Sequence, residues 1–116
     1  MYGTVAKMRL RPGAEALFRA QFAALIHAQL KGWISTTFFR SDTDPLDLWM
    51  VVVFESLEAY RENAERPNMD AVYRRIRGCL ESDPVWSDGQ VMAAYGQVRR
   101  ASSHSGTTGR VTRHPS

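Results

Sequence analysis

The sequence of 116 residues lacks several features that would assign it to a special class of protein. Its single cysteine, Cys79, rules out a disulfide within the chain, which is typical of proteins from a reducing compartment. No apolar run approaches the roughly 20 residues of a membrane span, and no charged-then-apolar leader precedes the first strand pattern. These absences predict a soluble, cytoplasmic protein with no membrane partner.

Acidic residues are missing from the C-terminal end. From Gln97 onward the chain has four arginines and no acid, whereas the preceding part has eleven basic and twelve acidic side chains. A near-neutral body of this kind predicts no nucleic-acid partner. The C-terminal end also lacks apolar periodicity, so we expect one folded domain over residues 1–96 and a basic, disordered tail over 97–116.

Histidine is scarce, and none of the three is well placed for catalysis. Helical spacing puts His27 on a water-facing side, and His104 and His114 lie in the tail. No cluster of histidine, cysteine and acidic residues has metal-ligand spacing, and no Gly-rich phosphate loop is present. The sequence therefore predicts neither a metal nor another cofactor.

Strand and helix patterns alternate along the part of the chain before the tail. β-branched, aromatic or alternating apolar residues indicate strands at residues 2–10, 33–41, 48–55 and 90–96. Apolar residues at helical spacing indicate helices at 12–31, from Ser56 to about Ala64, and from Pro67 to a point before Pro84. The order predicts an α+β, ferredoxin-like β-α-β-β-α-β fold, with an antiparallel sheet and helices on one face.

The strand expected at 48–55 is apolar at every position from Leu48 to Phe54, so it needs cover on both faces. The helices can cover only one face. An apolar sheet face of several hundred Å² is not expected to stay wet, and a second copy related by a two-fold axis covers it most simply. We therefore expect a homodimer through the second sheet face. The pattern leaves open whether Trp49, Val51 and Val53 or the alternate residues face the partner.

The segment DPLDLWMVVVFESLEAYRENAERPN, together with this element order, resembles the antibiotic biosynthesis monooxygenase superfamily of dimeric α+β barrels. The resemblance covers residues 2–96. It depends on Asp-Pro in the hairpin, a strand ending in Phe-Glu-Ser, a helix with Glu-Ala-Tyr, and a proline some eleven residues after the serine. It implies a dimeric α+β barrel, and its best-known members oxygenate quinols and polyketide-like aromatics without a cofactor.

The resemblance also indicates candidate site residues. Asn63 and Asn68 stand where many enzymatic relatives carry histidine; an amide can orient a substrate oxygen but cannot transfer a proton near neutral pH. We expect both to bind substrate, and Trp49 to stack on it unless it lies in the core or dimer interface. Tyr73 and Arg77, one helical turn apart, are the expected catalytic pair, with the guanidinium stabilising an enolate or phenolate.

Two functions remain open at this point. The first is a cofactor-independent monooxygenase acting on a small enolisable aromatic or quinol, whose anion itself reduces O₂ inside a desolvating pocket. The alternative is a non-catalytic small-ligand-binding or structural homodimer of the same fold, since fold does not determine function. The amides in place of histidines favour the alternative, and the family's best-known activity favours the enzyme.

Overall fold

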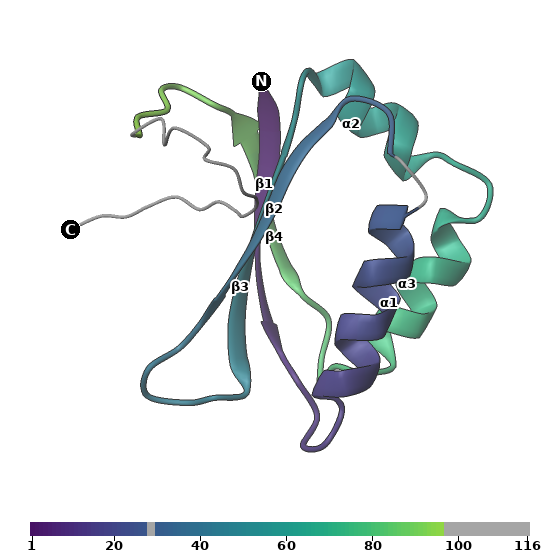
Figure 1. Cartoon of the computed structure of the whole chain (residues 1–116), viewed down its shortest axis with the longest axis vertical. Helices are drawn as coiled ribbons and strands as arrows, with labels where there is room; N and C mark the ends of the chain where they lie inside the picture. The colour runs from purple at the N-terminus through teal and green to yellow at the C-terminus, as the bar shows by residue number, and fades with distance from the viewer. Residues whose placement is uncertain (28–29, 97–116) are drawn as a thin grey trace, which may run out of the picture.

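The computed structural model describes residues 1–27 and 30–96, except for the side chain of His27. A four-stranded antiparallel sheet has all three of the described helices on one face (Figure 1). In chain order the elements are β1 (Tyr2–Arg9), α1 (Glu15–His27), β2 (Trp33–Arg40), β3 (Asp47–Phe54), α2 (Leu57–Ala64), α3 (Met69–Arg77) and β4 (Val85–Gln90). The predicted ferredoxin-like α+β fold is confirmed. The tail predicted for 97–116 lies outside the described residues.

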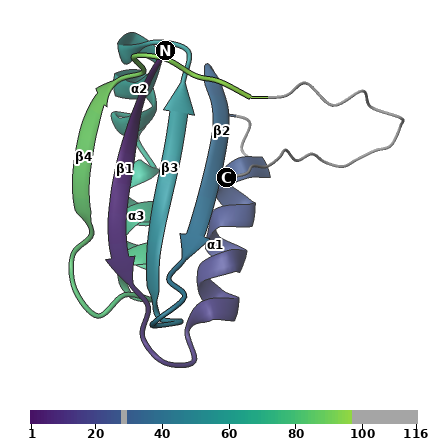
Figure 2. The ribbon, with the colours of Figure 1, turned by 90° about the vertical axis from the view of Figure 1, so that its left-hand side faces the viewer.

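The strands lie in the order β2-β3-β1-β4, so β3 and β1 are central and β2 and β4 form the edges (Figure 2). In the antiparallel register Ala6 lies opposite Met50 and Val5 opposite Val51. Directly opposed residues share a face, and successive residues alternate between faces. β3 is thus paired along both of its edges, by β1 and β2.

The fourth strand is predicted at 90–96, and this prediction is wrong. β4 instead runs over Val85–Gln90, although it contains Asp88 and Gly89, two residue types that favour turns. Backbone pairing with β1, from Lys7 opposite Val85 to Tyr2 opposite Gln90, holds this polar segment extended despite its low strand propensity. Residues 91–96 leave the sheet on the side away from the helices (Figures 1 and 2).

The helix boundaries follow local signals. Gly13 and Gly32 have φ angles of 82° and 75°, in the left-handed region that suits glycine, and they lie before α1 and before β2. The Ser56 hydroxyl accepts a hydrogen bond from the Ala59 amide at 3.1 Å, which confirms the predicted N-cap of α2. Within the described residues, no helix combines the length and apolar character needed to cross a bilayer.

The core lies between the helices and the sheet face that they cover. Leu48, Met50 and Phe54 of β3 point into it, together with Ala6 and Met8 of β1. The sequence did not decide which set of β3 residues faces away from the helices. Because successive residues alternate between faces, Trp49, Val51 and Val53 point to the other face of the sheet. The helix side also buries Leu10, Phe18, Ile76, Cys79 and Leu80.

None of the described helices covers the other face of the sheet (Figure 1). Val5, Phe39 and Val85 on this face are 43%, 57% and 66% exposed. Trp49, Val51 and Val53 are half-buried beside them. We call this surface, made of these six residues, the open face.

Glu15 connects the start of α1 to the end of β2, and the stability that this contact contributes should depend on pH. Its carboxylate accepts hydrogen bonds from Arg40 at 2.7 Å and from Arg19 at 2.9 Å, which together lower the pKa of Glu15 to about 2 from an ordinary value near 4.5. Because the folded-state pKa is lowered, the stabilisation is present above about pH 4.5 and is lost as the pH falls towards 2. Glu15→Gln should lower Tm at pH 7 by a few degrees, and wild type and variant should converge near pH 2.

Thermal unfolding followed by circular dichroism between pH 2 and pH 8 measures this difference. Asp42→Asn removes the same charge from an exposed turn residue with no ion pair in the described chain, so it should not reproduce the effect. A difference in Tm that is independent of pH would show that Glu15 acts through packing or helix propensity instead.

Candidate functional site

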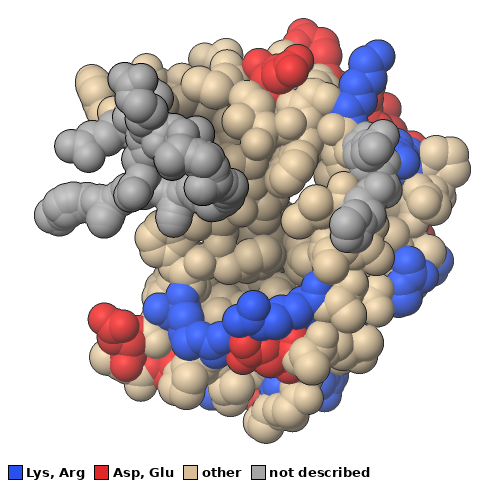
Figure 3. All heavy atoms as spheres, viewed as in Figure 1, with Lys and Arg blue, Asp and Glu red and all other residues tan. Residues whose placement is uncertain are grey.

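A cavity of about 810 Å³ lies between the helices and the covered face of the sheet. Figure 3 shows a hollow with uncharged side chains inside and above it and a band of basic and acidic side chains along its lower edge. The volume lies within the range typical of small-molecule sites. Its walls are mostly apolar, with Met50, Val52 and Phe54 from β3, Phe22 from α1 and Trp86 from β4.

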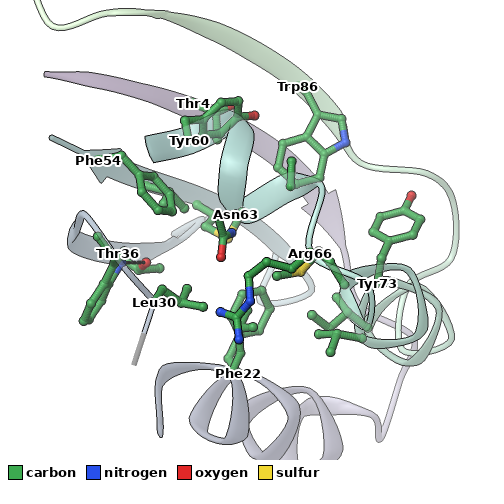
Figure 4. A pocket seen from close by; sticks show the side chains of 18 of the residues that line it. Thr4, Phe22, Leu30, Thr36, Phe54, Tyr60, Asn63, Arg66, Tyr73 and Trp86 are labelled. Atoms are coloured by element: carbon green, nitrogen blue, oxygen red, sulfur yellow. Dashed lines mark hydrogen bonds between the residues drawn. The ribbon is translucent and has the colours of Figure 1, made fainter. Parts of the chain in front are cut away.

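Asn63, in the last turn of α2, points its side chain into this cavity (Figure 4). Its Oδ1 atom is buried and has no hydrogen-bond donor among the described residues. An unpaired buried carbonyl oxygen costs roughly 1–3 kcal/mol, and an amide flip would not remove the cost because the NH₂ group would then need a partner. Unsatisfied groups of this kind suggest a binding role, here for a ligand that donates a hydrogen bond.

Tyr60 and Asp88 form a polar pair on another wall of the cavity. The Tyr60 hydroxyl donates to Asp88 Oδ1 at 3.3 Å, and the ring packs on Phe54 and Tyr2 at centroid distances of 5.7 and 5.2 Å. Burial raises the pKa of Tyr60 above its ordinary value, and the Asp88 charge raises it further. Tyr60 therefore stays protonated at neutral pH and acts as a donor, which leaves Asp88 as the proton acceptor of the pair.

Arg66 is a third polar group of the cavity, on the link between α2 and α3. Its side chain is half-buried and extends towards Phe22 and Leu30 (Figure 4). Within residues 1–27 and 30–96, its guanidinium has neither an ion pair nor a hydrogen bond. An arginine in this position can bind an anionic group of a ligand.

The structure brings together only some of the residues that the sequence indicated. Asn63 and Tyr73 line the cavity, with the Tyr73 ring at its edge (Figure 4). Arg77 does not line it, because its guanidinium is held by Asp83 at 2.6 Å and by the Leu80 carbonyl at 2.9 Å. Of the expected catalytic pair, the structure therefore places Tyr73 at the cavity and Arg77 outside it.

Two further candidates also lie elsewhere. Asn68 is exposed at the start of α3, and its side chain makes no capping hydrogen bond. Trp49 lies on the open face, where Lys7 Nζ is 5.3 Å from its ring centroid. The side chain of Trp49 therefore points away from the cavity, because β3 alternates its residues between the two faces.

Sequence reasoning missed Tyr60, Arg66 and Asp88 as site residues. Tyr60 stood within the Glu-Ala-Tyr pattern, and Arg66 directly before the proline of the same segment, so the signal was available. Asp88 lies before the strand predicted at 90–96, and no local pattern could have connected it to Tyr60 across 28 residues. Within the described chain, no group of three or more histidine, cysteine or acidic side chains could hold a metal ion.

Comparisons with known proteins support the fold. A family model described as antibiotic biosynthesis monooxygenase matches residues 1–75. No curated protein sequence matches the chain.

Several solved structures share the fold. SnoaB, a cofactor-independent oxygenase from Streptomyces nogalater, has a TM-score of 0.69 and 18% identity over 80% of this chain and 94% of its own. Rv0793 from Mycobacterium tuberculosis has a TM-score of 0.66 and 18% identity over 80% and 96%. A conserved protein from Methanosarcina mazei Go1 has a TM-score of 0.68 and 15% identity over 77% and 90%. At these identities the similarity shows the fold alone.

Proposed function

Because the chain belongs to the antibiotic biosynthesis monooxygenase family, we propose that it is a cofactor-independent monooxygenase acting on a small enolisable aromatic or quinol in this cavity. The carrying observation is Asn63 Oδ1, a buried acceptor that has no donor among the described residues and lies in a mostly apolar cavity of ligand size. A phenolic or enolic hydroxyl would satisfy this oxygen, while the apolar walls would bury the rings.

The proposed reaction needs no external reductant. A quinol, or an anthrone as its enol tautomer, gives its hydroxyl proton to Asp88, and Tyr60 holds the Asp88 carboxylate in place through its hydrogen bond. The resulting anion transfers electrons to O₂; one oxygen atom forms a bond to a ring carbon and the other leaves as water. An anthrone is thereby converted to a quinone, and both electron pairs needed to reduce O₂ come from the substrate.

Asn63 and Tyr73 would position the substrate in this scheme. The Asn63 amide would bind the substrate oxygen from the end of α2, and the Tyr73 phenol could donate a hydrogen bond at the edge of the cavity. The apolar walls exclude water, so the substrate anion reacts in a medium of low polarity. Arg77, Asn68 and Trp49 have no part in the proposed site, because they lie outside the cavity.

We also propose that the protein is a homodimer whose two-fold axis passes through the open face. The monomer leaves Val5, Phe39 and Val85 between 43% and 66% exposed on one side of the sheet. Met92 and Tyr95, in the segment that leaves the sheet on that side, are 96% and 95% exposed. A second copy is the simplest cover for such a surface on a small chain.

Oxygen uptake tests the enzymatic proposal. Purified protein with 1,8-dihydroxyanthrone or 1,4-dihydroxynaphthalene should consume O₂ faster than the spontaneous reaction of each probe. Binding of these probes without accelerated O₂ consumption would favour the alternative, a non-catalytic ligand-binding dimer. The observation that favours this alternative is the absence of histidine among the described cavity residues.

Asn63→Ala should separate function from stability. We expect kcat/KM for O₂ uptake to fall about tenfold, because one substrate hydrogen bond is lost. Tm should stay unchanged or rise by a few degrees, since the substitution removes an unsatisfied buried oxygen. Glu62→Ala, at an exposed position of the same helix, should leave kcat/KM unchanged. A lower Tm with unchanged kcat/KM would assign Asn63 a structural role.

A further inference from the structure

Arg66 differs from the other half-buried arginines of the described chain. Arg9 contacts Asp44 at 2.7 Å and Asp47 at 2.8 Å, and Arg77 contacts Asp83 at 2.6 Å. Arg66 is half-buried as well, yet no acidic group lies within ion-pair distance of it in the described residues. The chain has thus partly desolvated a permanent positive charge without supplying its counter-charge.

The backbone holds Arg66 in a defined position. Its amide donates to the Asn63 carbonyl at 3.3 Å, and its carbonyl accepts from the Met69 amide at 3.0 Å. Both hydrogen bonds belong to the turn that connects α2 to α3, and Pro67 restricts the chain between them. The side chain therefore starts from a fixed point at the wall of the cavity.

The direction of the side chain suggests what it binds. In Figure 4 the guanidinium lies on the side of Phe22 and Leu30, whereas Tyr60 and Trp86 lie on the opposite side of the cavity, with Asn63 between them. A ligand spanning this space would place its hydroxyl near Asp88 and a second polar group near Arg66. An anionic second group is favoured, because Arg66 would attract it and the distance from Asp88 would limit repulsion.

We propose that Arg66 forms an anion subsite in this cavity, and that the preferred ligand is a hydroxylated planar aromatic that also carries a carboxylate. This inference deepens the proposed function, because it depends on the cavity being the ligand site. Guanidinium binds carboxylate through two parallel hydrogen bonds, which are stronger than hydrogen bonds between neutral groups. The neighbouring apolar side chains of Phe22 and Leu30 reduce screening by solvent ions.

Equilibrium binding of two matched probes tests the subsite without any turnover. The free protein should bind 6-hydroxy-2-naphthoate at least tenfold more tightly than the neutral 6-hydroxy-2-naphthamide, as measured by calorimetry in low salt. Arg66→Gln should abolish this preference by weakening only the carboxylate probe, and Arg66→Lys should retain part of it. Raising the salt to 0.5 M should weaken the carboxylate probe selectively.

Arg74→Gln is the matched control, since it removes the same charge from a side chain that is 72% exposed on α3. It should leave the preference unchanged. Equal affinity of the wild type for the two probes would overturn the subsite. An equal loss of affinity for both probes in Arg66→Gln would also overturn it, because it would show that the arginine stem acts by packing. Oxygenase activity is tested separately with the neutral anthrone, so either proposal can fail while the other stands.

Discussion

Replacing Val51 by lysine should convert the protein from a dimer to a monomer. Val51 lies in the central strand β3, opposite Val5 on β1 and Thr37 on β2, so its side chain is in the middle of the open face. In a two-fold interface the new ammonium group would be buried without a counter-charge, which should raise the dissociation constant at least 100-fold. In the monomer the same lysine would reach water at little cost.

Light scattering coupled to gel filtration at micromolar concentration measures this change. The wild type should have about twice the chain mass of 13.1 kDa, and Val51→Lys should have the mass of one chain. Leu17→Lys, at a position 56% exposed on α1, introduces the same group on the helix side and should remain dimeric. A monomeric wild type would overturn the dimer. A dimeric Val51→Lys would move the interface to another surface.

Val52→Lys offers an internal comparison one residue along the same strand. Val52 faces the helices and packs against the core, so lysine at this position should destabilise the fold itself. The variant should show a much lower Tm or fail to fold, whereas Val51→Lys should retain its secondary structure. Similar behaviour of the two variants would contradict the assignment of the two sheet faces.

The sequence was most informative where local pattern and tertiary environment agree. The run from Leu48 to Phe54 predicted a strand, and β3 runs over Asp47–Phe54. Ser56 predicted the start of α2, because an N-cap depends on contacts within four residues. These features could be deduced because each needs little information from distant parts of the chain.

The errors concern features that depend on distant parts of the chain. β4 contains Asp88 and Gly89, whose local preference for a turn is overridden by pairing with β1. The orientation of Arg77 is determined by Asp83, in the connection after α3, and helical spacing alone could not exclude that contact. The Tyr60–Asp88 pair depends on the same β4 register, so an error in the strand boundary concealed part of the candidate site.

Asp88→Asn should lower kcat for the oxygenation of 1,8-dihydroxyanthrone by about 100-fold, because the amide cannot accept the substrate proton. Tyr60→Phe should have a smaller effect, about tenfold or less, since it removes only the hydrogen bond that holds the Asp88 carboxylate. Tyr60 itself is not the base at neutral pH, because burial and the Asp88 charge raise its pKa above the ordinary value. Asp42→Asn, which removes an exposed carboxylate outside the cavity, should leave kcat unchanged.

The pH dependence distinguishes a base from a residue that only supports the fold. Relative to the wild type, Asp88→Asn should lose most kcat/KM near neutral pH, where the substrate hydroxyl is protonated and needs a base. The variant should recover activity as the pH approaches the pKa of the free substrate, because the substrate then ionises in solution and needs no base. A uniform loss of activity at every pH, accompanied by a lower Tm, would instead show that Asp88 supports β4. An unchanged kcat would place the proton acceptor elsewhere in the cavity.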